Sequence, residues 1–587
     1  MISSIFYFLT FYIFIAIVTW HSPAKVAVKK VVNTIDIKKV FIVIGLLLYC
    51  IFFVRFTVSQ DNTIYTWDWA GYWKNSIDRT NLLFSVNFMD GLKSLWYSIN
   101  FDDYNTYLPS VIALPLHFTG AGFVNYVTVV AFFFLTPALI LHGLLAVRLL
   151  SNKNASSVFC LSIFLGVIYC TFYRALLRGM IDVAILIPIS LAIFYLLEFD
   201  FSKIDHVRNV FVSLLLLLAW ISRRYALFFV VGYVVTMIYK AIYDYIKQEK
   251  KSNVIIKTTV FNFLEIGGIS LCVLLIFFKD FLLNTIMSNG EAFTAYKLPF
   301  IVSFLSLMVY QSVMHVVLLC VSVYICIVNR KYLNQLVIIL ILTISTFCSF
   351  LNVQTPGIQH GLIWATGFFI LQILIFDFYN ESKKIKVRIN ILTVLLVVDF
   401  IIVGFGHFIM KEGEYKEASY MHFPLVREDI VNVNKIVDSI NSRTQEKNDT
   451  YVAVGEQLFN SDTIRNVRLP EIINATPSAS FVSDVDLRDG FPSSFLSAHY
   501  VLACNSPSCT YNNGEEILRY INTEIINTES HIGKHYNLIE SYDIDGGLTI
   551  KIYERVSDYS INDLELIAKH FDEIYPHHEE LFRDRIL

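Results

Sequence analysis

The sequence predicts an α-helical polytopic membrane protein, with about twelve transmembrane helices, followed by a C-terminal soluble α/β domain. Of its 587 residues, 55% are hydrophobic and only 16% are charged, whereas soluble proteins are about 25% charged. Apolar runs succeed one another through residues 1–410, and residues 411–587 have the composition of a soluble protein. We therefore expect a transmembrane domain, 1–410, and a separate domain, 411–587.

Twelve apolar runs are long enough to be considered as helices that cross the hydrocarbon core, which takes roughly 20 residues. They are 3–20, 40–58, 122–147, 156–173, 182–198, 209–222, 225–243, 258–282, 301–328, 335–351, 361–378 and 390–409. The first run is expected to be a retained helix, because it has neither the basic start nor the small-residue cleavage site of a signal peptide. The stretch 108–121 contains two prolines and is expected to be a half-helix or an interfacial segment.

The basic residues of the short loops predict the orientation. Loops 21–39, 244–257 and 379–389, and the other loops of the same alternate set, are rich in Lys and Arg. Such loops face the cytoplasm. The N-terminus, the large loop 59–121 and the C-terminal domain are then all expected on the outer, extracytoplasmic side.

The outer loop 59–121 is rich in aromatic residues. It contains the run Trp67-Asp68-Trp69-Ala70-Gly71-Tyr72-Trp73 and later the run Asp102-Asp103-Tyr104-Asn105. Between them, residues 88–99 have one apolar face, which is typical of a helix lying in the membrane interface. Trp side chains are also common at that depth.

Asp68 is the candidate catalytic residue of this loop. It follows a membrane helix and is surrounded by aromatic residues, where a low dielectric raises the pKa of a carboxylate and suits it to act as a general base. The structural alternative is an acidic residue that caps a helix near the interface.

This layout resembles the GT-C superfamily of membrane glycosyltransferases. The resemblance is carried by the Asp68 segment, by the segment Asp102–Asn105 and by the outer stretch 353–360, in a chain of many membrane helices that ends in a soluble domain. It implies a polyprenyl-phosphate sugar as donor, a glycan or lipid as acceptor, and Asp68 as the base. Trp67, Tyr72 and Tyr104 become candidate substrate-binding residues.

Transfer from such a donor needs cations, because negative charge grows on the leaving phosphate. Arg174, Arg178, Arg223 and Arg224 fall on the expected outer face, against the general bias of basic residues. Arginine grips phosphate oxygens in a fork, and the pair Arg223–Arg224 with Arg178 forms the candidate donor-phosphate site. Each arginine has an alternative role, as a side chain that reaches lipid headgroups.

The outer loop around Pro356 offers neutral polar groups, and its Gln354, Gln359 and His360 are candidate substrate contacts or simply parts of a polar turn. Asp102 and Asp103 are also candidate substrate contacts. Their carboxylates suit a divalent metal such as Mg²⁺ or Mn²⁺, or else mark a solvated loop end. No other cofactor is implied.

The C-terminal domain alternates helical and strand patterns. We expect a helix over 433–440, strands at 451–454 and 500–503, a hairpin of 536–544 and 547–554, and a helix that begins after Ser560. Cys504 and Cys509 are its only cysteines. An outer compartment would allow them to form a disulfide, and free thiols are the alternative. This domain is expected to shape acceptor access.

Other functions remain alternatives to a glycosyltransferase. A flippase or transporter of lipid-linked glycans should place ionisable residues deep in the helices. Only Glu265, Asp377 and Asp399 are scattered there, with no partner evident from the sequence. A glycan polymerase or ligase would share the outer site but use a diphosphate donor. The small net charge of −3 argues against nucleic acid. The expected location, among membrane lipids, is a bacterial plasma (inner) membrane.

Overall fold

The computed structural model describes all residues of the chain except 151–153, 248–252, 288–295, 380, 406–424, 444–448, 477–478, 481–484 and 506–513. Its contacts divide the chain into two compact units. The helical unit comprises Met1–Gln60, Asn75–Ser288 and Leu298–Pro424, and the sheet unit comprises Asp61–Lys74, Asn289–Lys297 and Leu425–Leu587. Each unit is described separately below.

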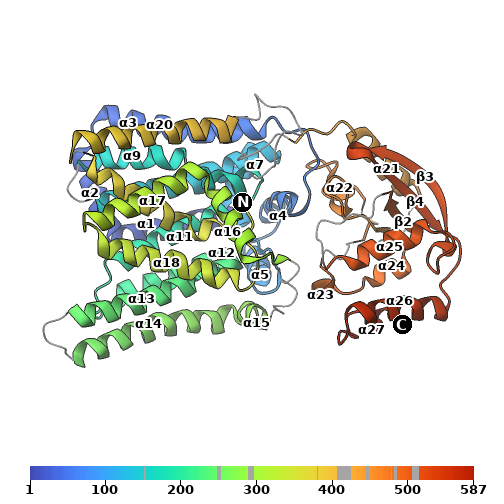
Figure 1. Cartoon of the computed structure of the whole chain (residues 1–587). Coiled ribbons are helices and arrows are strands. Elements are labelled where there is room, and N and C mark those ends of the chain that lie inside the picture. Colours follow the sequence, from blue (N-terminus) through green and yellow to red (C-terminus); the bar gives the residue numbers. More distant parts are fainter. Residues whose placement is uncertain are drawn as a thin grey trace. The chain divides into compact units, whose positions relative to one another are not determined.

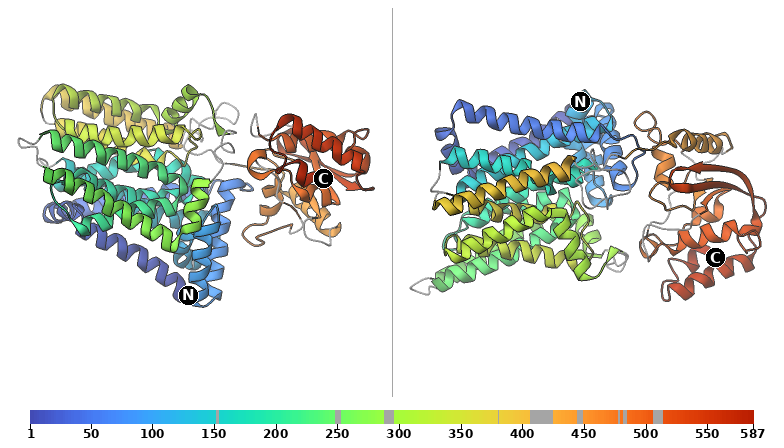
Figure 2. Two further views of the ribbon diagram at one scale, coloured as in Figure 1. Left: turned by 90° about the horizontal axis from the view of Figure 1, so that it is seen from below. Right: turned by 45° about the horizontal axis from the view of Figure 1, so that its top comes forward.

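Long helices that lie side by side form the helical unit (Figures 1 and 2). Their bounds are α1 Ile2–His21, α2 Ala24–Thr34, α3 Ile37–Val58, α4 Trp67–Ser85, α5 Phe88–Phe101, α6 Tyr107–Thr119, α7 Phe123–Val130, η1 Ala131–Leu135, α8 Thr136–Leu149, α9 Ala155–Val167, α10 Thr171–Leu177, η2 Ile181–Ile185, α11 Leu186–Leu197, α12 His206–Ser222, η3 Arg224–Ala226, α13 Leu227–Lys247, α14 Asn253–Phe277, α15 Lys279–Met287, α16 Phe300–Gln311, α17 Val313–Val328, α18 Leu333–Leu351, α19 Leu362–Ile373, η5 Leu374–Phe378 and α20 Lys383–Phe405. Helix α4 begins in the sheet unit and continues into the helical unit.

The prediction of a helical membrane protein is confirmed in its coarse form. Within the described residues, seven helices are long and apolar enough to cross a membrane, and two bent helix pairs bring the number to nine. The remaining three expected spans correspond to shorter apolar helices, Ile181–Leu197, His206–Ser222 and Leu362–Phe378. That all twelve segments cross the membrane therefore stays a prediction.

Two expected spans are broken. The run 156–173 forms α9 and α10, which meet at 46°, and the run 301–328 contains a break at Ser312 where the chain bends by 93°. Ser312 has a φ of +67°, in the left-handed region that side chains other than glycine rarely adopt. Hydropathy did not reveal these breaks, because the residues on both sides are apolar. The expected span 258–282 also ends earlier, since α14 stops at Phe277 and α15 is a separate helix.

Glycines allow three helices to pack closely. A Cβ added to Gly232 of α13 would collide with the Thr346 hydroxyl of α18. A Cβ added to Gly367 of α19 would collide with the Thr343 hydroxyl, which also belongs to α18. Small residues at helix crossings are typical of membrane proteins, because van der Waals packing replaces the hydrophobic effect between helices in lipid. Helix α18 therefore packs closely against both α13, at Gly232, and α19, at Gly367.

The acidic residues within the helices have partners that were not evident from the sequence. Glu265 lies 2.6 Å from His206 Nδ1, Asp377 forms an ion pair with Lys331, and Asp399 accepts a hydrogen bond from the Ser312 hydroxyl. These partners come from distant parts of the chain, so no sequence motif connects them.

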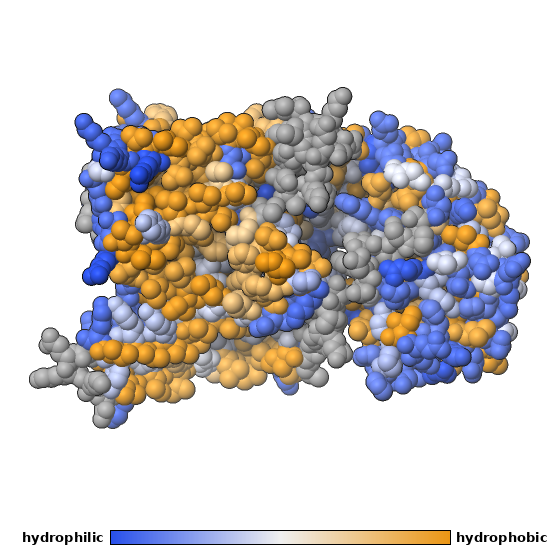
Figure 3. Space-filling view, in the orientation of Figure 1, coloured by the Kyte–Doolittle hydropathy of each residue, from blue (hydrophilic) through white to orange (hydrophobic). Residues whose placement is uncertain are grey.

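Exposed apolar side chains cover the helical unit. Phe41 is 67% exposed, Leu264 68% and Ile276 71%, and such residues form the broad hydrophobic surface seen over the helices in Figure 3. Large apolar patches are rare on soluble monomers. A lipid-facing surface accounts for this exposure.

The sheet unit is a small α/β fold, as predicted. Its elements are α21 Ile430–Arg443, β1 Thr450–Val452, α22 Ser461–Asn466, α23 Asp486–Asp489, α24 Ser493–Ser497, β2 Tyr500–Cys504, α25 Glu516–Ile526, η8 Gly533–His535, β3 Tyr536–Ile544, η9 Asp545–Gly547, β4 Leu548–Arg555, α26 Ile561–Ile574 and α27 Arg583–Ile586. The strand order is β1-β2-β4-β3, with β1 parallel to β2 and the other pairs antiparallel. The expected hairpin is β3–β4, and Ser560 caps α26 in a capping box.

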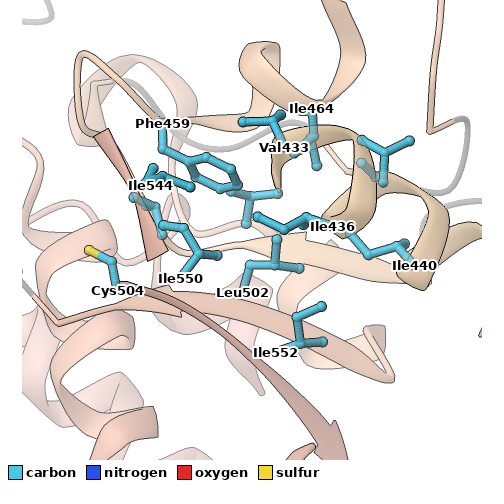
Figure 4. Close-up of a cluster of buried hydrophobic side chains, with 14 of the residues drawn as sticks. Val433, Ile436, Ile440, Phe459, Ile464, Leu502, Cys504, Ile544, Ile550 and Ile552 are labelled. Atoms are coloured by element: carbon cyan, nitrogen blue, oxygen red, sulfur yellow. The ribbon is translucent and has the colours of Figure 1, made fainter. Parts of the chain in front are cut away.

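Side chains alternate across this sheet. Leu502 and Cys504 of β2 pack with α21 on one face, whereas Val501 and Ala503 pack with α25 and α26 on the other. Figure 4 shows the first of these cores, where Ile436 and Ile440 of α21 lie over the strands. Because both faces are covered, β2 is buried along its whole length.

Part of the first expected outer loop belongs to the sheet unit. Residues Asp61–Lys74 are grouped with it, Asn62 forms a parallel bridge with Val426, and Ile64 is buried in the core that contains Ile436. The expected division at residues 410/411 did not anticipate this, because the segment is separated in sequence from the rest of that fold.

Candidate functional site

The two adjacent arginines of the helical unit reach different partners. Arg223 follows α12 in an extended backbone conformation, and Arg224 begins η3. Arg223 Nε lies 2.7 Å from Asp182 Oδ1, and Arg224 Nη1 lies 2.7 Å from Asp103 Oδ1.

The Arg223–Asp182 pair lies out of solvent. The Asp182 side chain is 0% exposed and that of Arg223 is 12% exposed. A charge pair buried to this extent is costly to break, because the remaining charge is left without compensation. Tyr225 adds a hydrogen bond, since its hydroxyl donates to the same Asp182 oxygen at 2.6 Å.

Aromatic rings flank the Arg223 guanidinium. Its Cζ lies 5.7 Å from the ring centre of Tyr104 and 5.5 Å from that of Tyr225. Both distances fall within the range of cation–π attraction. The predicted substrate contact Tyr104 and the predicted phosphate contact Arg223 therefore lie together.

The segment 102–105 is fastened to the end of α12. Besides its ion pair with Asp103, Arg224 donates from Nη2 to the Asp102 carbonyl oxygen at 3.0 Å. Asn105 donates from its side chain to the Ile221 carbonyl oxygen at 2.7 Å. Charge-assisted bonds of this kind are stronger than neutral ones, so two predicted site segments form one arrangement.

The loop around Pro356 joins the same arrangement. Tyr225 Oη lies 3.2 Å from the Gln359 carbonyl oxygen, and the ring of Tyr225 stands edge-on to that of His360 at 4.8 Å. Gly357 permits the tight turn, because an added Cβ would lie 2.9 Å from the Gln359 side-chain oxygen.

His360 is held as a neutral imidazole. Its Nδ1 accepts the Gly357 N–H at 2.8 Å, which places the ring proton on Nε2. Burial and the nearby Arg223 cation lower the pKa of His360 to about 3. Gln354 Nε2 lies 3.5 Å from His360 Nε2. Both nitrogens carry hydrogen in this tautomer, so a hydrogen bond between the two side chains requires the Gln354 amide to turn its oxygen toward the ring.

The other two predicted arginines, Arg174 and Arg178, belong to α10 and its C-terminal end. Arg178 ends α10 as its C-cap residue, and it interacts electrostatically with Arg174, which is buried. The predicted role of Arg178 at the phosphate stays a prediction.

Trp67, Asp68 and Tyr72 belong to the sheet unit. Asp68 is half-buried in the first turn of α4, and Tyr72 is buried. The first turn of a helix stabilises a carboxylate through the helix dipole, which agrees with the capping alternative given above. Whether Asp68 is a base stays a prediction.

The predicted disulfide lies partly outside the described residues. Cys504 ends β2 and is buried, and Asn522 donates to its backbone oxygen at 3.2 Å. Cys509 falls in the range 506–513, which the structure does not describe. The pairing therefore stays a prediction.

Among the described residues, one group combines three metal-ligating side chains. Atoms of Cys170, His315 and Asp399 lie within 4.8 Å of one another. Both His315 ring nitrogens face other oxygens, at 2.8 Å to Gln372 and 3.2 Å to the Ile168 carbonyl, and the buried Arg174 interacts electrostatically with Cys170 and Asp399. A buried cation beside the carboxylate does not suit a divalent metal.

Asp102 and Asp103 also suit a metal poorly. Asp103 is already engaged by the Arg224 guanidinium at 2.7 Å, so one of the two carboxylates balances an arginine. We therefore derive no step through a metal ion at this pair.

The sequence-based reasoning missed the two residues at the centre of the arrangement. The Tyr225 hydroxyl donates to Asp182, which forms an ion pair with Arg223, although the sequence drew attention to the arginines alone. One signal was present, since a buried arginine needs an acidic partner and Asp182 is an acidic residue at the start of an apolar run.

No protein-family model matches the chain, and no curated protein matches it either.

Proposed function

We propose that this protein is a membrane glycosyltransferase, which moves a sugar from a polyprenyl-phosphate donor to a cell-envelope glycan or lipid at the outer face of the membrane. The observation that carries the proposal is the arrangement of Arg223 and Arg224 with Asp182, Asp103 and Tyr225. It unites residues from separate segments into one aromatic-lined site that holds two arginines, each paired with an aspartate.

The donor phosphate is the natural ligand of such a site. Its negative charge grows as the sugar leaves, and preorganised cations stabilise that charge without reorganising. Asp182 fixes the Arg223 side chain through Nε. Arginine suits a phosphate ligand, because its planar guanidinium carries a permanent charge and matches the geometry of phosphate oxygens.

The acceptor needs a base as its hydroxyl attacks the anomeric carbon. Asp68 is our candidate for this role, and Trp67 and Tyr72 are candidates for contacting the sugars. His360, Gln354 and Gln359 offer neutral polar groups to the same substrates. The lipid tail of the donor would lie among membrane lipids, in accord with the exposed apolar surface of the helices; we propose the bacterial plasma membrane as the location.

The test is sugar transfer in membranes that contain the protein and a polyprenyl-phosphate sugar, with no nucleotide sugar present. The unchanged protein should transfer the sugar, and Asp68→Asn should lose at least about 100-fold in rate, in line with the loss of a general base. Asp558→Asn, an exposed acidic residue of the same unit, is the control and should remain active. A fully active Asp68→Asn variant would move the search for the base to Asp102.

A transporter of lipid-linked glycans is the second candidate, and one observation favours it. Polar groups gather at the two helix breaks, where Asp399 bonds Ser312 and His315 faces the Ile168 carbonyl. Irregular backbone within a membrane protein is often found where it lines a path or a binding site. Movement of a lipid-linked glycan across vesicles, lost in Asp399→Asn while sugar transfer is absent, would establish this function instead.

A polymerase or ligase would use the same outer groups. Supplying a polyprenyl-diphosphate glycan in the transfer assay distinguishes it, because that donor alone would then be consumed.

A further inference from the structure

The candidate base Asp68 is built into the fold of the sheet unit. Ile64 is buried among Phe459, Ile464 and the residues of the strands. The backbone of Asn62 exchanges hydrogen bonds with that of residues 425–427, donating to the Leu425 oxygen at 2.8 Å and accepting from Arg427 at 2.9 Å. The segment 61–74 therefore folds together with residues distant in sequence.

The short helix α22 forms two hydrogen bonds to the backbone just before Asp68. Asp462 and Asn466 stand four residues apart on α22, and residues at this spacing share a helix face. Asp462 Oδ2 accepts the Trp67 N–H at 2.8 Å, and the Asn466 amide donates to the Tyr65 carbonyl oxygen at 3.1 Å.

Helix α22 is itself well fixed. Asn460 accepts from the Thr463 backbone N–H at 3.1 Å, while the Thr463 hydroxyl accepts the Asn460 N–H at 3.1 Å. This reciprocal pair is a capping box. Ile464 of the same helix is buried in the core, so α22 offers a rigid platform.

The bond from Asp462 compensates for a strained start of α4. Trp67, the first residue of α4, has a φ of +49°, which costs on the order of 1–3 kcal/mol for residues other than glycine. Helix N-termini also leave backbone N–H groups without partners. Asp462 accepts the N–H of the Thr66–Trp67 peptide, one peptide before the Asp68 Cα, and so holds the backbone that leads into Asp68.

We propose that Asp462 is a positioning residue for Asp68, so that the sheet unit does more than shape acceptor access: it sets the direction of the catalytic carboxylate. This inference rests on the proposed function, in which Asp68 takes the proton of the acceptor. A carboxylate displaced by about 1 Å loses on the order of 100-fold in rate.

The experiment compares Asp462→Ala with Asp462→Asn in the full-length protein. Alanine removes the acceptor of the Trp67 N–H, whereas asparagine keeps an acceptor oxygen. We expect Asp462→Ala to lower kcat about 100-fold with little change in KM for the donor, and Asp462→Asn to restore most of the rate. Asp558→Ala is the matched control, because Asp558 is a 95% exposed acidic side chain of the same unit.

Hydrogen exchange of the backbone at residues 66–70 is the second readout, and it does not depend on activity. It should become faster in Asp462→Ala and stay unchanged in Asp558→Ala. Should Asp462→Ala fail to fold, Asn466→Ala removes the neighbouring bond and should give the same pattern in weaker form.

This design distinguishes a failure of the positioning role from a failure of the proposed function. If exchange quickens in Asp462→Ala but kcat does not fall, the positioning role is wrong. If exchange is unchanged, the contact itself does not hold the segment. If the unchanged protein transfers no sugar from any polyprenyl-phosphate donor, the proposed function fails first, and the role of Asp68 fails with it.

Discussion

Asp182 Oδ1 forms an ion pair with Arg223, whose Nε lies 2.7 Å away, and accepts a hydrogen bond from the Tyr225 hydroxyl at 2.6 Å. A carboxylate oxygen has two lone pairs and accommodates both. Because Asp182 is fully buried, the three side chains stabilise one another. We therefore expect that substitution of any one of them weakens the contacts of the other two.

Breaking the Arg223–Asp182 pair should destabilise the helical unit. Arg223→Gln or Asp182→Asn alone is expected to cost about 3–5 kcal/mol, because a buried charge is left alone. The double variant should recover at least half of this loss, which thermal unfolding of the purified protein in detergent measures. Equal instability of the double variant would show that the two charges are not coupled.

Arg224 should affect the donor more than the fold. Its partner Asp103 is 80% exposed, and exposed ion pairs contribute about 0–1 kcal/mol. Arg224→Ala is therefore expected to leave thermal stability nearly unchanged while raising KM for the donor about tenfold, with Arg224→Lys intermediate because lysine keeps charge without the fork. Arg388→Ala, an exposed arginine of α20, is the control and should not alter KM.

His360 should not contribute a titration to the pH profile of transfer. Its pKa is lowered to about 3, whereas an ordinary histidine titrates near 6.5. The imidazole is then neutral across pH 5–8, and His360→Gln should change the rate without changing the shape of the profile. If the unchanged protein shows a rate change centred near pH 6–7 and His360→Gln does not, His360 titrates in that range, which would contradict the buried, neutral state.

Asp486 makes the sheet unit less stable as the pH rises. Burial raises its pKa to about 7, above the unfolded value of about 3.9, so the folded state binds the proton more tightly. The protonated Asp486 therefore contributes up to about 4 kcal/mol to the free energy of unfolding. This contribution is fully present below pH 4 and is lost between pH 4 and 7.

Asp486→Asn removes this dependence. The asparagine stays neutral and keeps an oxygen that accepts the Glu516 and Ile517 N–H groups, as Asp486 does now. At pH 8 the variant should be more stable than the unchanged protein, and the two should converge at pH 4. Hydrogen exchange at these two amides, corrected for intrinsic pH dependence, measures this; Asp558→Asn should behave like the unchanged protein.

Local sequence patterns predicted more of the fold than of the candidate site. The hairpin β3–β4 and the capped helix after Ser560 were predictable, because turn and capping residues act on their neighbours in sequence. The 93° bend at Ser312 was not, because apolar residues continue through it. The arginine pair was visible as adjacent charges in an apolar region, but its partners Asp182 and Asp103 are distant in sequence, and only tertiary packing brings them together.

The membership of residues 61–74 in the sheet unit imposes an order on biosynthesis. The carbonyl of Tyr65 bonds Asn466, which is synthesised 401 residues later. At about 5–20 residues per second, ribosomes need roughly 20–80 s to make that stretch. During this interval Ile64 and its neighbours have no core to enter, so a chaperone at the site of insertion would be expected to shield them, and a truncated product would leave them exposed to proteases.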